Sequence, residues 1–174
     1  MLREKFEIAP LSRPGEVMSP PKSISRTAPS SIAINTVISS VLTVQTSGAG
    51  FVDLTAEVAR FIGDARAQEG MATLFIRHTS ASLTIQENAD PSVLRDLMTT
   101  LDRFAPEELD WTHDTEGPDD MPAHVKTMLT ATSLQVPVLK GRLALGTWQA
   151  IYLIEHRSSP HRREVVLQFL GGST

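Results

Sequence analysis

The chain has 174 residues, enough for one domain of ordinary size and too few for two large ones. Cysteine is absent, which excludes disulfides, thiolate zinc sites, iron–sulfur clusters and a cysteine nucleophile. The net charge of -4 gives no broad attraction to nucleic acid, and no apolar run approaches the roughly 20 residues that span a bilayer, so we expect neither partner.

Residues 1–32 have the composition of a flexible leader. Between residues 10 and 31, five prolines lie among many serines, with few large apolar side chains to bury. The absence of cysteine favours a cytoplasmic protein, with a cysteine-free secreted protein as the alternative. The segment lacks the apolar middle section of a secretory signal, while a basic, Ser-rich organelle-targeting segment stays open. The folded domain is expected over residues 33–174.

The first half of this domain is predicted to alternate between strand and helix. An apolar strand face begins near residue 34 and is followed by a turn at 47–50. Apolar residues at helical spacing over 54–62 predict a helix that Asp53 or Thr55 could cap. Two short strands are expected near 71–77 and 82–87.

The second half is predicted to hold two helices and three strands. Asp90 caps a helix that begins at Pro91 and buries one apolar stripe between Leu94 and Leu101. An acidic loop over 105–121 leads to a third helix, which begins at Pro122 and has Val125, Met128 and Leu129 as its apolar positions. Strands near 134–138, 147–155 and 164–170 close the domain, and Pro137 favours an edge position for the first of them.

About seven strands with three helices predict an α+β fold, with a mostly antiparallel sheet or sandwich and the helices packed outside. Charge is uneven along this fold. Residues 87–120 carry 11 acidic and 2 basic groups, whereas 121–174 carry 2 acidic and 6 basic groups. Such neighbouring segments are usually solvated faces, but they also supply the two halves of a site for a metal cation and an anionic substrate.

Three histidines are candidates for metal ligands because each lies at the end of a different predicted element. His78 follows a strand, His124 lies in the first turn of a helix, and His156 ends a strand. The helix dipole keeps the His124 ring neutral, which is the form that binds a metal. Three imidazoles with an open fourth position form a catalytic divalent-metal centre, and the alternative is three unrelated surface or hydrogen-bonded histidines.

Other side chains are candidates for substrate binding and proton transfer. Asp120 could orient a histidine ligand or serve as a base, and His113 could touch substrate. The connection after His78 is rich in hydroxyl groups, among them that of Ser80. The arginines proposed to bind phosphate oxygens are Arg77, Arg142 and Arg157, and Trp148 could stack on a ring or belong to the core. The chain has no Gly-rich phosphate loop, no Gly-x-Ser-x-Gly elbow and no HExxH, so those enzyme classes are excluded.

From about Ile34 to Gly171 the sequence resembles the YjbQ-type family, whose members are described as secondary thiamine-phosphate synthases. The resemblance rests on five strings, at residues 78–84, 87–91, 119–124, 141–149 and 155–157. It implies a small α+β domain that assembles as a homotrimer, with a histidine site that binds metal or an anion. It also implies His78, His124 and His156 as ligands, with Asn88, Asp120 and Arg157 nearby. The leader at 1–32 is not part of the family pattern.

We therefore expect a metal-assisted enzyme, with zinc or magnesium, that acts on a phosphorylated small molecule and has weak thiamine-phosphate synthase activity. That transferase reaction expels pyrophosphate, which a cation would stabilise. Two alternatives stay open. The same site could support hydrolysis by a metal-bound water, or the protein could be a trimeric metal- or ligand-binding module without catalysis.

Overall fold

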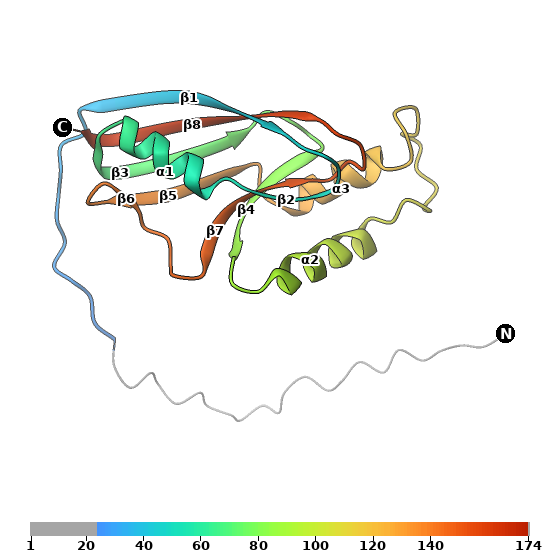
Figure 1. The fold of residues 1–174 in the computed structure, drawn as a ribbon, viewed down its shortest axis with the longest axis horizontal. Coiled ribbons are helices and arrows are strands. Elements are labelled where there is room, and N and C mark those ends of the chain that lie inside the picture. Colours follow the sequence, from blue (N-terminus) through green and yellow to red (C-terminus); the bar gives the residue numbers. More distant parts are fainter. Residues whose placement is uncertain (1–23, 174) are drawn as a thin grey trace. The chain divides into compact units, whose positions relative to one another are not determined.

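The structure is a computed structural model that describes residues 24–173. Residues 24–31 belong to a separate unit and form neither helix nor strand, while the folded unit begins at Ile32 (Figure 1). Most of the proposed leader, residues 1–23, lies outside the described residues, so its flexibility stays a prediction.

Within the described residues the domain contains three helices and eight strands. The helices are α1 (Thr55–Asp64), α2 (Pro91–Phe104) and α3 (Asp120–Leu129). The strands are β1 (Thr36–Gln45), β2 (Gly50–Asp53), β3 (Ala67–Ile76), β4 (Ala81–Glu87), β5 (Ser133–Leu139), β6 (Arg142–Leu143), β7 (Gln149–Glu155) and β8 (Arg162–Ser173).

The strands form two sheets in which every pairing is antiparallel. The larger sheet has the order β1-β8-β3-β5-β6, and the smaller has the order β2-β7-β4. The α+β prediction is confirmed. Pro137 lies in β5, which is flanked on its outer side only by the two-residue strand β6, in keeping with the limited room that a sheet gives to proline.

The core lies between the inner faces of the two sheets and is closed by α1 (Figure 1). Successive side chains of a strand point to opposite faces of the sheet, so alternate residues of β3 belong to the core. Leu74 and Ile76 are buried, while Phe75 between them is 48% exposed on the outer face. Helix α1 contributes Val58, Phe61 and Ile62, which recur at helical spacing as the sequence predicts. The Asp53 carboxylate accepts a hydrogen bond from the Thr55 N–H at the start of this helix.

Two predicted helices differ from expectation. Helix α3 begins at Asp120 rather than Pro122, and its apolar Met128 is 77% exposed while the polar Lys126 is buried. The apolar residues of α3 therefore predict the wrong buried face, because the face that is buried includes the polar residues Asp120, Lys126 and Thr127. Helix α2 begins with the predicted Asp90 cap on the Ser92 N–H, but none of its residues is fully buried.

A third difference lies beside the predicted turn at 47–50. The turn itself is present, but it leads into β2, a four-residue strand that pairs with β7. A strand of this length offers too few alternating positions for a pattern to be recognised.

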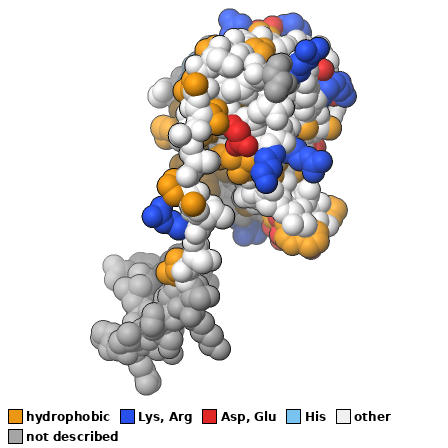
Figure 2. All heavy atoms as spheres, turned by 90° about the vertical axis from the view of Figure 1, so that its left-hand side faces the viewer, with side chains coloured by type: hydrophobic (Ala, Val, Ile, Leu, Met, Phe, Trp, Pro, Cys, Tyr) orange, Lys and Arg blue, Asp and Glu red, His pale blue; other side chains and the backbone are white. Residues whose placement is uncertain are grey.

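Three connections meet at one end of the domain. The β3–β4 connection lies beside the start of β8, because the Arg77 N–H donates to the Glu164 carbonyl. The β7–β8 connection follows Glu155, which is paired with Ala81 at the start of β4. The third connection is the acidic loop that leads into α3, on the right in Figure 1. The face on the left of Figure 1 is shown in Figure 2, where Lys and Arg side chains lie among apolar ones.

Candidate metal site

Two residues of α3 and one of the preceding loop bring three metal-binding groups together. Asp120 and His124 are four residues apart, so both project from the same face of the helix. His113 reaches the same point from the acidic loop. One ligand atom of each residue lies within 4.8 Å of the others. Among the described residues, this is the one group of three possible metal ligands that lie so close together.

The distances fit the coordination shell of a small divalent ion. Asp120 Oδ2 lies 2.8 Å from His113 Nε2 and 3.4 Å from His124 Nε2. Two atoms that each lie about 2.1 Å from one zinc ion, at tetrahedral angles, are roughly 3.4 Å apart. The 3.4 Å separation matches this value, whereas the 2.8 Å contact is shorter and would have to lengthen if both atoms bound one ion.

A backbone carbonyl sets the tautomer of His124. Its Nδ1 lies 2.9 Å from the Thr79 carbonyl oxygen, which can only accept a hydrogen bond, so Nδ1 carries the proton. In the neutral ring Nε2 is then a bare lone pair, and it faces a carboxylate oxygen 3.4 Å away. Two acceptors that face each other repel unless a cation or a proton lies between them. A histidine that donates through its second nitrogen to a carbonyl is also the usual arrangement of a metal ligand.

The two oxygens of Asp120 have different partners. Oδ1 accepts a hydrogen bond from Arg157 Nη1. Oδ2 is buried and receives no well-directed hydrogen bond from any described residue, although His113 Nε2 is close. A buried carboxylate oxygen without a donor is unfavourable, and a bound cation would remove that cost.

Arg157 fixes this carboxylate rather than facing solvent. Besides Asp120, its guanidinium contacts the Glu116 carbonyl at 2.7 Å and Asp119 Oδ2 at 3.2 Å, and the residue is 9% exposed. Burial acts to raise the pKa of Asp119, but hydrogen bonds from Ser158 and Arg157 outweigh it and lower that pKa to about 2. Protein oxygens bind Nη1 and Nη2 of Arg157, while its Nε has no well-formed hydrogen bond among the described residues. This arrangement favours a positioning role for Arg157, and phosphate binding by this residue stays a prediction.

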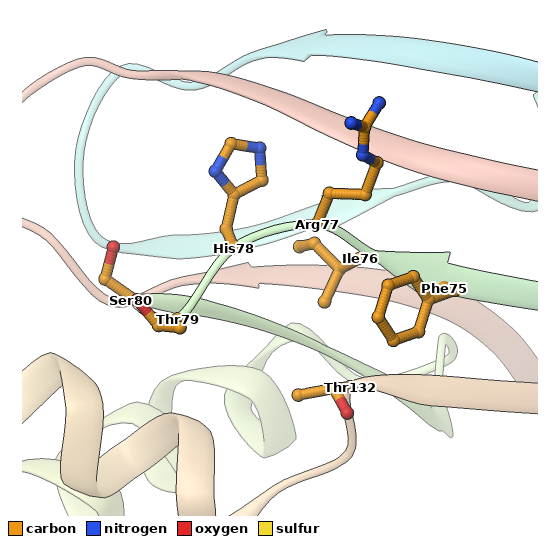
Figure 3. A pocket seen from close by; sticks show the side chains of 7 residues that line it. All are labelled: Phe75, Ile76, Arg77, His78, Thr79, Ser80 and Thr132. Atoms are coloured by element: carbon orange, nitrogen blue, oxygen red, sulfur yellow. The ribbon is translucent and has the colours of Figure 1, made fainter.

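A pocket of about 440 Å³ adjoins the cluster at Thr79. The side chains that line it are those of Phe75, Ile76, Arg77, His78, Thr79, Ser80 and Thr132 (Figure 3). The predicted residues Arg77, His78 and Ser80 therefore share one pocket. Thr79 links this pocket to the cluster, because its carbonyl oxygen contacts His124 Nδ1.

His78 has a defined role in this pocket that differs from metal binding. Its Nε2 accepts a hydrogen bond from the Glu164 N–H at 2.8 Å, so the neutral ring carries its proton on Nδ1. Burial, followed by the charge of Arg163, lowers the pKa of His78 and keeps the ring neutral. His78 therefore presents Nδ1–H as a hydrogen-bond donor (Figure 3).

The expected set of three histidine ligands is not brought together within one chain. His78 Nε2 is occupied as described, and His156 is buried with Nε2 2.9 Å from Ser82 Oγ. Only His124 of the three belongs to the cluster, together with His113 and Asp120. Spacing along the chain could not reveal this, because His113 lies in a loop without apolar periodicity.

The remaining predicted residues lie elsewhere in the same chain. Asn88 donates its backbone N–H to the Trp148 carbonyl, where β4 and β7 begin to pair at the end away from Glu155. Six strand steps separate Gln149 from Glu155, about 20 Å. Trp148 is 64% exposed, and Arg142 is exposed on β6. None of these three residues lines the pocket beside the cluster.

Sequence reasoning missed a buried ion pair that supports this end of the domain. Glu155 is fully buried, and its carboxylate accepts hydrogen bonds from Arg163 Nε at 2.7 Å and Thr46 Oγ1 at 2.8 Å. Arg163 also approaches the Ser80 carbonyl at 3.4 Å. The Glu155–Arg163 pair therefore joins the β7–β8 connection to the pocket. The sequence feature that could have indicated it is the acidic Glu155 at the end of the mostly apolar strand β7.

Comparison with known proteins gives a consistent result. A family model described as UPF0047 protein YjbQ-like matches residues 40–172. The chain is 45% identical over 132 residues to the UPF0047 protein sll1880 of Synechocystis, covering 75% of this chain and 90% of that protein. It is 41% identical over 131 residues to the UPF0047 protein YjbQ of Escherichia coli O157:H7, covering 75% and 95%.

Solved structures resemble the domain as well. A protein of the YjbQ/UPF0047 family from Clostridium acetobutylicum matches with a TM-score of 0.69 and 38% identity, covering 74% of this chain and 98% of that one. A hypothetical protein from Aeropyrum pernix matches with a TM-score of 0.72 and 27% identity, covering 78% and 99%.

Proposed function

This chain belongs to the YjbQ-like UPF0047 family, and from that premise we propose that it is a metal-assisted enzyme acting on a phosphorylated small molecule. The observation that carries the proposal is the 3.4 Å contact between His124 Nε2 and the buried Asp120 Oδ2, with His124 Nδ1 held by the Thr79 carbonyl. The ligands are His113, Asp120 and His124.

The ligand set favours zinc over magnesium. Two imidazoles with one carboxylate are typical of catalytic zinc, whereas magnesium prefers oxygen ligands. With three protein ligands, a fourth position stays open for substrate or water. A divalent ion there would polarise a phosphoryl oxygen or lower the pKa of a bound water.

The chain's own residues would bind and orient the substrate. His78 would donate its Nδ1–H to a phosphate oxygen in the adjoining pocket, with Arg77 and the Ser80 hydroxyl beside it (Figure 3). Arg77 is half-exposed and lies 3.3 Å from Glu164, so it could exchange this exposed ion pair for a phosphate. Arg157 would hold Asp120 in place and is a positioning residue.

Metal content tests the ligand assignment. We expect the wild-type protein to retain about one zinc ion per chain after dialysis, by elemental analysis, and His124→Ala to retain almost none, because three ligands are reduced to two. His161→Ala is a matched control, since the Nδ1 of His161 also contacts a backbone carbonyl, that of Ser159, yet the residue lies outside the cluster. A wild-type protein that binds no zinc, or equal binding by both variants, would refute the site.

Turnover distinguishes the reactions that such a site could support. Zinc-loaded protein would be offered a phosphate monoester and, separately, the pyrimidine diphosphate and thiazole phosphate that yield thiamine phosphate. Release of inorganic phosphate supports hydrolysis, while release of pyrophosphate supports the synthase reaction. Zinc binding that raises Tm without turnover of either would favour the non-catalytic binding module.

We further propose that copies of the chain associate as a homotrimer, as the resemblance implies. Support comes from the outer face of the larger sheet, where apolar side chains are exposed. Two apolar rows cross it: Val37 is paired with Leu170, and Val41 and Phe75 flank Val166. Val37, Val41 and Phe75 are each about half exposed, which is unusual for a row of neighbouring apolar side chains.

A further inference from the structure

A second pocket lies on the other flank of α3 from the candidate metal site. Lys126 lines this pocket. It comes two positions after His124 in α3, and two positions correspond to a rotation of about 200° around the helix axis, so the two side chains point in different directions. The pocket has a volume of about 280 Å³. Its remaining lining residues are Ala49, Asp102, Ala105, Pro106, Glu107, Glu108, His156 and Ser158. The volume suits a small metabolite rather than a large cofactor.

His156 gives this pocket an unused polar atom. The residue is 2% exposed, and its Nε2 is paired with Ser82 Oγ, whereas Nδ1 is buried and has no hydrogen-bond partner among the described residues. Burial, followed by the charge of Lys126, lowers the pKa of His156 to about 4, so the ring is neutral at physiological pH. A buried ring nitrogen without a partner is unfavourable, and a ligand atom beside it would satisfy it.

Lys126 supplies further unused hydrogen-bonding capacity. The residue is 5% exposed, and among the described residues its Nζ makes one hydrogen bond, to Asp102 Oδ1 at 2.7 Å. An ammonium group has three N–H donors, so two remain for a ligand. Ser158 already donates its hydroxyl hydrogen to Asp119 Oδ2, which leaves its oxygen as an acceptor.

The charges around the pocket select the class of ligand. Three acidic residues, Asp102, Glu107 and Glu108, line the pocket together with a single basic one, Lys126, so an anion would meet a surplus of negative charge. A cation of the ammonium type has only N–H donors, so it could not accept a hydrogen bond from the buried Lys126. A neutral hydroxyl avoids both penalties, since its oxygen accepts from Lys126 while the group hydrogen-bonds with the neutral His156 ring.

We propose that this pocket, built around Lys126 and His156, binds a neutral polyhydroxylated small molecule, of the class of polyols and simple sugars. The pocket does not share its ligand-binding side chains with the candidate metal site, so the proposal does not depend on the metal.

The test is a titration of the full chain, labelled with ¹⁵N in its histidine rings, with ribose and with glycerol. We expect a saturable shift of the His156 Nδ1 resonance and none at His161. Ala49→Leu should remove the response, because Ala49 is exposed at the pocket and a larger side chain there fills the space without touching the core. Lys126→Met should also remove it, and circular dichroism would show that each variant is folded.

Specific outcomes would overturn the proposal. A His156 resonance unmoved by ribose and glycerol would show that the pocket holds only water. A shift with inorganic phosphate or methylamine, but not with ribose, would refute the neutral class. His124→Ala should keep the ribose response even if it loses zinc, and loss of that response would show that the pocket is not separate from the metal site.

Discussion

The two carboxylate oxygens of Asp120 show how single atoms determine the chemistry of this site. Arg157 engages Oδ1, which leaves Oδ2 directed at two imidazole nitrogens. The Thr79 carbonyl removes the alternative tautomer of His124. Neither Arg157 nor Thr79 would bind the ion, yet their contacts orient Asp120 and His124 so that Oδ2 and Nε2 face each other.

At the residue scale, Asp119 predicts how stability depends on acid. Its pKa falls from 3.8 to about 2 in the folded protein, so between those values the unfolded chain binds more protons and stability decreases as the pH is lowered. We expect Asp119→Asn to be less stable than the wild type above pH 3.8 and to show a shallower loss of stability below it. Urea unfolding at several pH values measures this.

The control for this experiment is Asp110→Asn, an exposed position in the same acidic loop. It should reproduce the acid dependence of the wild type. If Asp119→Asn and the wild type lost stability in parallel between pH 4 and 2, the hydrogen bonds from Ser158 and Arg157 would not stabilise the charged carboxylate.

At the scale of elements, the closest backbone approach lies between β3 and β8. Gly70 is paired with Gly171, and the ring of Phe169 covers both glycines. A Cβ built on Gly171 would lie 2.2 Å from the Glu69 carbonyl oxygen and 2.7 Å from the Phe169 ring. The two glycines therefore allow these neighbouring strands to pair while Phe169 packs against them.

This contact predicts that Gly171→Ala destabilises the domain by about 1–3 kcal/mol, the usual cost of overpacking. Gly63→Ala is the matched control, because Gly63 lies in α1 and a Cβ there meets nothing within 4 Å. That variant should be neutral or more stable by up to about 1 kcal/mol, through its higher helix propensity. Free energies of unfolding in urea compare the two, and equal effects would contradict the packing argument.

At the scale of the whole domain, the two sheets differ in how their outer faces are covered. Helix α2 packs beside the smaller sheet, where its apolar residues line a pocket with Phe51 and Ile154. The larger sheet leaves Val37, Val41 and Phe75 exposed on its outer face. Across the described residues, no helix is both long enough and apolar enough to span a membrane.

The proposed homotrimer predicts that a charge on this face disrupts assembly. We expect Val41→Lys to lower the mass measured by light scattering from three chains to one, because an ammonium would be buried between apolar rows. Ala56→Lys, on the exposed side of α1, should leave the mass unchanged. A wild-type protein that is monomeric at all concentrations would refute the proposed association.

The sequence by itself determined the fold class, the core strands, the presence of three helices and the start of α2 at Pro91. Buried residues such as Leu74 and Ile76 alternate with exposed ones along the strands, because only one face of each sheet is buried. This two-residue period can be recognised from near neighbours in the sequence. It also marked Asp120, His113 and His124 as candidates for chemistry, because their side chains have few structural uses.

Only the tertiary structure decided which of those candidates meet. His78 and His156 were equally good ligands by position, but the folded chain places both outside the cluster of His113, Asp120 and His124, with hydrogen bonds to the Glu164 N–H and the Ser82 hydroxyl. These hydrogen bonds join residues 86 and 74 positions apart in the chain. Ligand sets and tautomers depend on such distant contacts, whereas periodicity depends only on near neighbours, and this is why the domain was predictable and the site was not.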